Sequence, residues 1–319
     1  MIALALSVSW AQQQAELQNE SDLQECLDTP RCGELFTTLL SETMLEMGLL
    51  FQHESLGGSA LVGKGNGVVA ELSFQSTAIG PKNVVQDQIP LPPIVPRLEV
   101  GYQVGSFTYD DPYPQYAVSA FVLPPIGIGD FKTFSAGLSG SFAFPLGTHL
   151  LWAGAEADLS YGSVAGPFVG DGDVIDDIDV VGSLIDVESP ACESTAQGCQ
   201  DRFRSVAMVP KIGLSFEPHP VLFGYGKLGL GWINSGIRVD YDRSEWRLRG
   251  LQPQLSYGGG ARLGDRVQIS FGAVTVLRDS SLSSDGSTAV TRFVGSFSIH
   301  TGDERYWSTE DQPGDRPSP

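Results

Sequence analysis

Apolar and polar residues alternate along most of the chain between residues 69 and 299. In each alternating segment one face carries Val, Leu, Ile, Phe or Ala, and the other carries mainly Ser, Gly, Gln and Thr. A period of two is typical of β-strands, because successive side chains of a strand point to opposite faces. The pattern predicts ten strands: Val69–Ile79, Leu98–Tyr109, Gln115–Leu123, Lys132–Phe144, His149–Tyr161, Arg204–Phe216, Val221–Ser235, Leu251–Leu263, Val267–Leu277 and Thr291–Ile299.

In the N-terminal part of the chain, the apolar positions follow the period of a helix instead. Apolar residues recur there at helical spacing, with glutamates between them, which predicts an amphipathic helix over about residues 33–52. The apolar stripe consists of Phe36, Leu40, Met44, Met47 and Phe51. A glycine-rich stretch, residues 56–67, follows the helix and separates it from the first strand.

The predicted connections alternate between short and long. The short ones cover residues 110–114, 145–148, 217–220 and 264–266, and the long ones cover residues 80–97, 124–131, 162–202, 236–250 and 278–289. With an even number of strands, the first strand begins and the last strand ends on the side of the short turns. This arrangement is typical of outer-membrane barrels, whose loops are short on one side and long on the other.

Either a soluble β-sandwich or a membrane barrel could produce this alternation. Several predicted strands exceed the usual strand length of about 5–6 residues and match the ~9–11 residues that a tilted membrane strand needs. The small polar residues on the second face suit the inside of a closed barrel better than a solvent-exposed sheet, which would carry more Lys, Glu and Arg. We therefore expect an all-β fold, a transmembrane antiparallel up-and-down β-barrel of about ten strands, with eight or twelve as alternatives, preceded by a short N-terminal α-helical segment.

Aromatic residues near the predicted strand ends fit the interfacial girdles of such barrels. They are Tyr109, Tyr116, Phe144 and Phe216 toward the short turns, and Phe134, Tyr161 and Trp232 toward the long loops. Over about residues 58–300 the chain resembles the bacterial outer-membrane β-barrel family of small, porin-like proteins, without a motif that identifies a subfamily. The resemblance implies an integral outer-membrane location and contact with lipid. Barrels of that family usually end in an aromatic terminal strand, whereas this chain continues past Phe297 and Ile299 to Pro319.

The net charge of −19 is concentrated in three segments. Residues 1–56 carry nine acidic and one basic residue, residues 162–202 carry nine and one, and residues 301–319 carry five and two, so the remaining chain is neutral. An acidic chain without a basic stripe is not expected to bind nucleic acid.

The first eleven residues combine a short apolar run, Ile2–Val8, with the small-residue site Ser9-Trp10-Ala11, which predicts a signal peptide remnant cleaved after Ala11. The expected organisation is a signal remnant (1–11), a periplasmic helical segment (12–57), an outer-membrane barrel (58–300) and a disordered acidic tail (301–319). We expect residues 21–56 to fold back as a plug or as a cap over the periplasmic mouth. The alternative is a partner-binding helix that lies free in the periplasm.

Four cysteines fall into two local pairs, Cys26 with Cys32 and Cys192 with Cys199. Three connectivities exist, and pairing within each local pair is the simplest. The expected topology puts the first pair in the periplasm and the second outside the cell, which excludes a bridge between the pairs. Disulfides fit an oxidising compartment.

Motifs for catalysis or cofactors are weak. Residues 58–65 resemble a P-loop but lack its Ser/Thr, and residues 224–229 match GxGxxG within a predicted strand, with no helix after them. We expect the alternate glycines of the second motif to let a plug approach the barrel wall. A cluster of aspartates could hold calcium weakly, but a solvated acidic loop explains it as well: Asp171, Asp173, Asp176, Asp177 and Asp179. The sequence predicts no catalytic residues, no enzyme activity and no cofactor.

The predicted lumen contains charged residues of both signs, which have to pair or bind water in a narrow barrel. They are Glu71, Glu99, Lys132, Glu156, Asp158, Lys211, Lys227, Arg262 and Arg292. The simplest interpretation is a structural ion-pair network, and the functional interpretation is a polar conduit or ligand pocket.

Three functions follow from this architecture. The first is an integral outer-membrane protein that is structural or a narrow conduit for a small polar solute. The second is an adhesin-like surface-binding protein that uses residues 162–202, with a divalent cation as a candidate ligand of the acidic loop. The third is a membrane-embedded hydrolase, against which the missing hydrolase motif counts. We expect a monomer.

Overall fold

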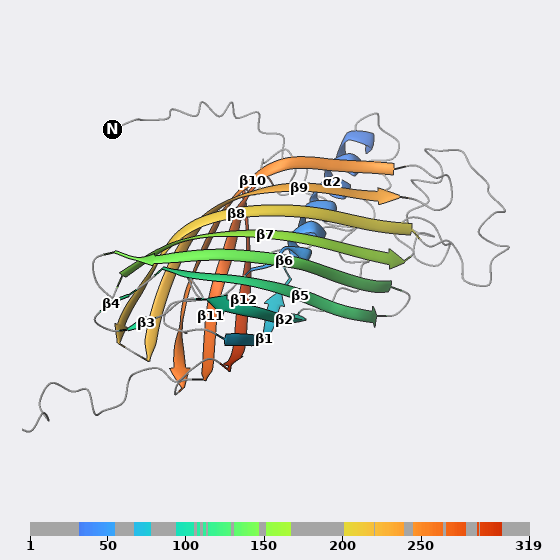
Figure 1. Cartoon of the computed structure of the whole chain (residues 1–319). Coiled ribbons are helices and arrows are strands. Elements are labelled where there is room, and N and C mark those ends of the chain that lie inside the picture. The colour runs from blue at the N-terminus through green and yellow to red at the C-terminus, as the bar shows by residue number, and fades with distance from the viewer. Residues whose placement is uncertain are drawn as a thin grey trace, which may run out of the picture.

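Ten long antiparallel strands close into a barrel, and in the described part of the chain one helix enters it (Figure 1). The computed structural model describes residues 32–54, 67–77, 94–104, 107–108, 111–112, 114–128, 131–146, 151–166, 201–219, 221–238, 245–263, 266–278, 286 and 288–301. The helix is α2 (Cys32–Phe51), and the barrel strands are β1 (Gly67–Ser76), β2 (Ile94–Val104), β5 (Gln115–Ile128), β6 (Phe131–Pro145), β7 (Leu151–Gly166), β8 (Asp201–His219), β9 (Leu222–Arg238), β10 (Glu245–Leu263), β11 (Val267–Leu277) and β12 (Ala289–His300).

Each barrel strand pairs with the barrel strands before and after it, and β1 pairs with β12 to close the barrel. The closing register runs from Val69 opposite His300 to Gln75 opposite Val294. A small hairpin of β3 (Phe107–Thr108) and β4 (Asp111–Pro112) lies in the connection between β2 and β5. The predicted ten-strand, up-and-down barrel with a short helix is confirmed.

The two faces of the wall differ as the alternation predicts. Leu138 is 59% exposed on the outer face, whereas its neighbour Ser139 is 6% exposed on the inner face. The same change repeats around the barrel, so the outer surface is largely apolar and the inner surface is rich in Ser and Gln. Because the barrel is closed, no strand edge is left unpaired. An apolar environment requires this, since it offers no hydrogen-bond partners to free backbone N–H and C=O groups.

The connections define the two ends of the barrel. We call the end that carries residues 105–114, 146–150, 220–221 and 264–266 the short-turn end, and the end that carries residues 77–93, 167–200, 239–244 and 278–288 the long-loop end. The long loop predicted over residues 124–131 is absent. β5 and β6 are joined at the long-loop end by residues 129–130 alone, because β5 continues through Pro124 and Pro125 to Ile128. The register shifts between Leu123 and Ile126, and such an irregularity accommodates prolines, which cannot donate to the strand ladder.

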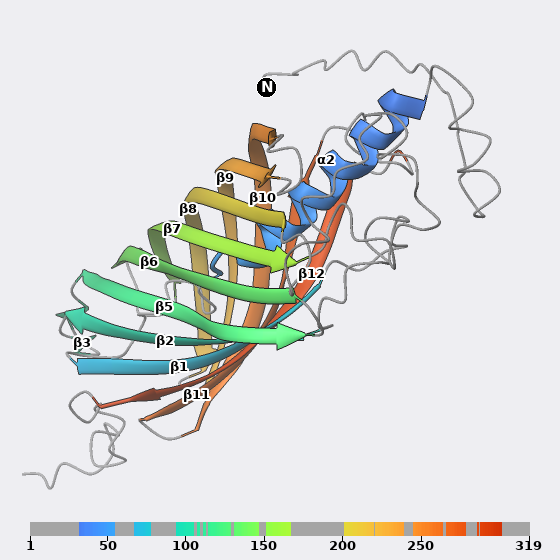
Figure 2. The ribbon, with the colours of Figure 1, turned by 90° about the vertical axis from the view of Figure 1, so that its right-hand side faces the viewer.

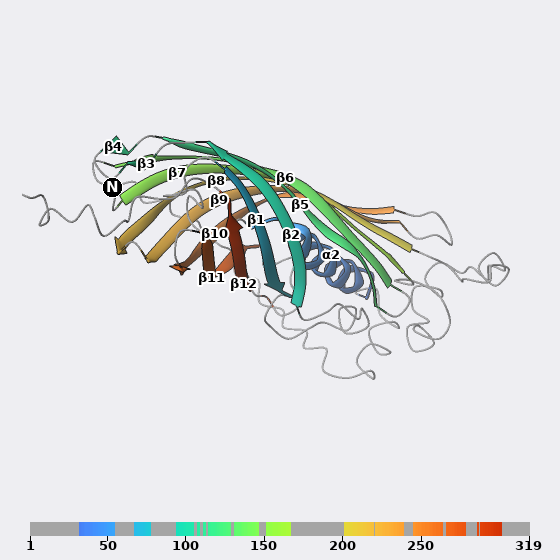
Figure 3. The ribbon, with the colours of Figure 1, turned by 60° about the horizontal axis from the view of Figure 1, so that its bottom comes forward.

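The C-terminal half of α2 lies within the barrel, and its Cys32 end projects at the long-loop end (Figure 2; Figure 3). Glu42 and Glu46 form ion pairs with Arg278, which directly follows β11 at that end. The sequence argument placed this segment at the short-turn mouth, because β1 begins there. Twelve residues separate Glu54 from Gly67, and an extended chain of that length covers up to about 40 Å, so the helix and the start of β1 need not lie at the same end.

The reversed direction of the helix also affects the cysteines. Cys32, the first residue of α2, belongs to the long-loop end rather than the short-turn end. The topological reason for excluding a bridge between the two cysteine pairs therefore fails. Cys26, Cys192 and Cys199 lie outside the described residues, as do the aspartates of the calcium prediction, the signal segment and the acidic tail.

Among the described residues, no helix is both long enough and apolar enough to cross a membrane.

Candidate functional site: a helix and a charge cluster in the barrel lumen

The apolar side of α2 packs against inward-pointing side chains of the wall. Met44, Met47, Leu50 and Phe51 belong to one buried cluster, which also contains Leu123, Val164, Phe203 and Ile237 from four different strands. Leu45 packs in a second cluster with Ala207, Val209 and Ile233. The predicted apolar stripe thus packs inside the barrel through its described members Met44, Met47 and Phe51.

Glycines allow the helix to approach the wall closely. A Cβ atom on Gly162 of β7 would lie 2.1 Å from Cγ of Phe51, and a Cβ on Gly48 of α2 would lie 2.9 Å from Oγ of Ser235. The alternate glycines of the GxGxxG segment do not have this role, contrary to the sequence argument. Gly226 lies on the outer face, where an added Cβ would meet nothing within 4 Å.

Two arginines of the wall cap the C-terminal end of α2. Arg97 of β2 donates to the carbonyl oxygens of Gln52, at 2.5 Å, and of Leu50, and Arg292 of β12 donates to that of Leu49. The last turn of α2 contains no basic residue of its own. Since the last carbonyls of a helix lack partners within it and carry partial negative charge, cations supplied by the barrel satisfy them.

The segment after the helix extends into a buried charge cluster. Nζ of Lys211 lies 2.8 Å from a carboxylate oxygen of Glu54, 2.6 Å from one of Asp158 and 3.1 Å from one of Glu156. Nζ of Lys227 lies 2.7 Å from the other oxygen of Glu156. One lysine thus ties the helical segment to β7. Removing one partner of such a buried pair typically costs about 3–5 kcal/mol, because it leaves a buried charge uncompensated.

A second polar group lies beside this cluster. Nε2 of His53 is 3.2 Å from a carboxylate oxygen of Glu99, which also accepts a hydrogen bond from Ser119. The imidazole stacks on Phe121, with 4.4 Å between ring centroids. Gln254 donates to the side-chain oxygen of Gln52 at 2.6 Å. Every residue from Gln52 to Glu54 therefore has a polar contact with the wall.

The structure brings together only part of the predicted lumen set. Glu156, Asp158, Lys211 and Lys227 form one cluster, and Glu71 is buried on the inner face. Arg262 pairs instead with Glu217, at 2.7 and 3.0 Å. The placement of Lys132 was wrong, because this exposed residue shares the outer face with Leu138. Its parity with Leu138 already indicated that face.

Four contributors were missed by the sequence argument: His53, Glu54, Arg97 and Glu217. Arg97 and Glu217 lie two residues from the predicted inward residues Glu99 and Ser215, so extending each strand by one repeat would have found them. Nothing in the period-two pattern indicates His53 or Glu54, because they lie between the helix and the first strand.

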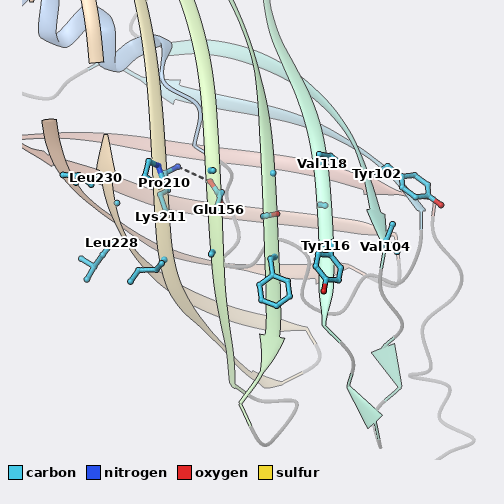
Figure 4. Close-up of a pocket in the computed structure, with 17 residues that line it drawn as sticks. Tyr102, Val104, Tyr116, Val118, Glu156, Pro210, Lys211, Leu228 and Leu230 are labelled. Carbon is cyan, nitrogen blue, oxygen red and sulfur yellow. Dashed lines mark hydrogen bonds and ion pairs between the residues drawn. The ribbon is translucent and has the colours of Figure 1, made fainter. Parts of the chain in front are cut away.

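The outer side of the wall has an apolar groove of about 950 Å³ directly behind the charge cluster (Figure 4). Its floor includes Gly140, Ala157 and Pro210, which are in register on neighbouring strands, and Tyr116 and Leu228 stand at its sides. Glu156 and Lys211 contact the groove only from the wall, since their side chains point inward. The groove belongs to the apolar outer face and adds no polar chemistry to the lumen site.

Searches against known proteins found resemblances among solved structures. No family model matches the chain, and no curated protein sequence matches it. The toluene transporter TodX of P. putida is 12% identical, with a TM-score of 0.36, over 79% of this chain and 71% of that chain. The translocator domain of the autotransporter NalP from Neisseria meningitidis is 9% identical, with a TM-score of 0.43, over 76% and 90%. Ail, the attachment invasion locus protein of Yersinia pestis, is 10% identical, with a TM-score of 0.28, over 74% and 98%.

These three proteins are bacterial outer-membrane β-barrels. The closed barrel of ten antiparallel strands in this chain is established by its own strand pairing.

Proposed function

We propose that this chain is an integral outer-membrane protein, a narrow conduit for small polar solutes that α2 closes in the conformation described here. The proposal has three parts, namely a membrane location, a polar path and a closing element. A different set of residues supports each part.

The outer face supports the membrane location. Large apolar side chains are exposed on every barrel strand, among them Val118, Ile212, Leu228, Leu251 and Phe271, each at least 62% exposed. Soluble monomers rarely expose contiguous apolar patches larger than a few hundred Å². A belt of this kind around a closed barrel is the expected surface of a protein in lipid.

The inner face supports a polar path. Its buried polar side chains come from strands all around the barrel, and most are uncharged. They include Gln75, Gln103, Gln115, Ser135, Ser139, Gln252, Gln254, Ser256, Gln268, Ser270, Ser296 and Ser298. Amide and hydroxyl groups can exchange protein partners for water or for a polar solute at little cost, whereas an apolar lining would exclude both.

The position of α2 is the observation that carries the closing role. Its C-terminal half packs against inward-pointing side chains of the wall. Polar contacts attach it as well: Arg97 and Arg292 at the carbonyls, Lys211 at Glu54, and Arg278 at Glu42. Individual hydrogen bonds of this kind contribute about 1.5–3 kcal/mol when one group is charged. These polar contacts act together with the apolar packing of α2, so opening requires the helix to leave both sets of partners.

Conductance in planar bilayers tests the closing role. The wild-type protein is expected to remain mostly closed, whereas Arg97→Gln combined with Arg292→Gln is expected to open frequently, because both substitutions remove caps from the helix end. Arg262→Gln is the matched control, since Arg262 faces the lumen but pairs with Glu217. Equal conductance of all three proteins would contradict the closing role.

The loops support an orientation. Outer-membrane barrels direct their long loops outward, so the Cys32 end of α2 would face the cell exterior. An epitope inserted near Gly182 should be accessible on intact cells, while one near Gly264 should not. The opposite labelling would reverse the orientation without affecting the fold.

A further inference from the structure

The outer face of the barrel is interrupted by a group of arginines at the long-loop end. Five exposed arginines share the face of the apolar belt: Arg202 and Arg204 on β8, Arg238 on β9, and Arg247 and Arg249 on β10. We call these five residues the arginine patch. Their parity on the strands matches that of Met208, Trp232 and Leu251, so they point away from the lumen.

The strand register gathers the arginine patch into one small area. Arg202 is directly opposite Arg238, and Gly236 is opposite both Arg204 and Arg247. Neighbouring strands are about 4.8 Å apart, so three strands bring the five guanidinium groups together. Four of the arginines line a pocket of about 610 Å³, in which Tyr161 and Asn234 also take part.

Such clustering is unfavourable without an anion. Like charges directly opposite each other on paired strands destabilise a sheet. Among the described side chains, none forms an ion pair with Arg202, Arg204 or Arg238, and the Nε of Arg249 donates to the neutral side chain of Asn234 at 3.1 Å. Glu245 of β10 is the residue opposite Arg238 in the register. In a chain with a net charge of −19, the juxtaposition of Arg202, Arg204 and Arg238 on the outer face indicates a site for an external anion.

The height of the arginine patch indicates where that anion lies. Tyr161 and Trp232 are half-exposed on the same outer face, nearer the middle of the barrel, and aromatic residues of this kind mark the boundary between the apolar layer and the headgroups. Counted from the row of Trp232, the arginines lie two to six residues farther along their strands toward the long-loop end. They therefore lie at the level of lipid headgroups, whose phosphates match the planar, bidentate guanidinium group.

We propose that the arginine patch binds the phosphate groups of a phosphorylated glycolipid in the leaflet at the long-loop end. The pocket is larger than a phosphate needs, and Asn234 and Tyr161 supply hydrogen-bonding groups for sugar hydroxyls beside the arginines. The inference depends on the membrane location proposed above but not on the conduit or its closure.

Binding can be measured by native mass spectrometry of the full chain in detergent. The probes are a diphosphorylated glucosamine lipid, the same lipid without phosphates, inorganic phosphate and heparin. The proposal predicts that the phosphorylated lipid binds and that the dephosphorylated lipid and inorganic phosphate bind at least tenfold more weakly. Each Arg→Gln substitution among Arg202, Arg204 and Arg238 should weaken binding by roughly fivefold.

Two further variants control for charge and folding. Arg266→Gln removes an exposed arginine at the short-turn end and should leave lipid binding unchanged. Arg238→Lys keeps the charge but loses the bidentate geometry, and it should weaken binding less than Arg238→Gln. Folding of every variant is checked by its heat-dependent shift on gels. If Arg238→Gln fails to fold, Arg238→Lys still tests the site.

Four results would overturn the proposal. Equal binding of the dephosphorylated lipid would exclude phosphate recognition, and equally tight inorganic phosphate would indicate an anion site without lipid. Tighter binding of heparin would indicate a surface for sulfated polysaccharides. If Arg266→Gln weakened lipid binding as much as the substitutions in the arginine patch, the binding would reflect general charge attraction rather than a specific site. The conductance experiment is independent of these probes, so the two proposals can fail separately.

Discussion

Gly162 offers the most direct test of how α2 packs inside the barrel. Gly162→Ala would put a Cβ atom 2.1 Å from Cγ and 2.4 Å from Cβ of Phe51, far inside van der Waals contact. Phe51 cannot move aside freely, because it is 1% exposed and its ring packs at 6.1 Å from that of Phe203. Overpacking a filled core typically costs about 1–3 kcal/mol, which we expect as the loss in the free energy of unfolding.

Gly140→Ala is the matched control, since Gly140 lies on the adjacent strand and an added Cβ there meets nothing within 4 Å. A compatible Gly→Ala change stabilises by about 0.4–1 kcal/mol, so the two variants should differ in sign. Urea unfolding in detergent, followed by the gel shift between folded and unfolded barrel, provides the free energies.

Phe51→Ala completes a double-mutant cycle with Gly162→Ala. It removes Cγ and Cδ2 of Phe51, two of the three atoms closest to the added Cβ, so the two substitutions should be less damaging together than the sum of the single effects. Equal stability of Gly162→Ala and Gly140→Ala, or strict additivity with Phe51→Ala, would refute the packing of α2 against β7.

Two further predictions concern the wall and the charge cluster. Leu138→Arg should lower the yield of folded barrel, because an arginine on the lipid face near mid-membrane costs roughly 2–4 kcal/mol, whereas Ser139→Arg on the inner face should do less harm; equal losses would contradict the assigned faces. Lys211→Met should lower the free energy of unfolding in urea by about 3–5 kcal/mol, since it removes the positive charge that three buried carboxylates share. Adding Glu54→Gln, which removes one of the three negative charges, should recover part of that loss. A Lys211→Met protein as stable as wild type would show that the cluster contributes nothing to stability.

The barrel could be predicted because its physics is local. A period of two fixes which side chains point outward, and strands such as Val267–Leu277 match the structure at both ends. Where strands extend beyond clear alternation, the pattern fades: β10 begins at Glu245, six residues before the predicted start, in a segment that also carries Arg247 and Arg249. In the sequence, a strand segment whose outward residues are charged resembles a loop.

The lumen site was less predictable because it depends on long-range contacts. The alternation indicates that Glu156 and Lys211 point inward, but their pairing depends on the register between β7 and β8. The direction of α2 follows from partners such as Arg97 and Arg278, which are distant in sequence from the helix. An amphipathic stripe shows that a helix must bury one side, and it does not show through which end of the barrel the helix enters.

A reversible cross-link between α2 and the wall tests the central claim most directly. The Cβ missing from Gly48 would lie 4.0 Å from Cβ of Ser205 on β8, within the range of a disulfide, whose Cβ atoms are about 3.5–4.5 Å apart. Gly48→Cys and Ser205→Cys would be introduced together with Arg97→Gln and Arg292→Gln, with the four native cysteines replaced by serine. Conductance would be recorded before and after reduction. The account predicts a closed barrel while the disulfide holds the helix and frequent opening once it is reduced. A barrel that conducts equally in both states, or that fails to form the cross-link, would contradict closure by α2.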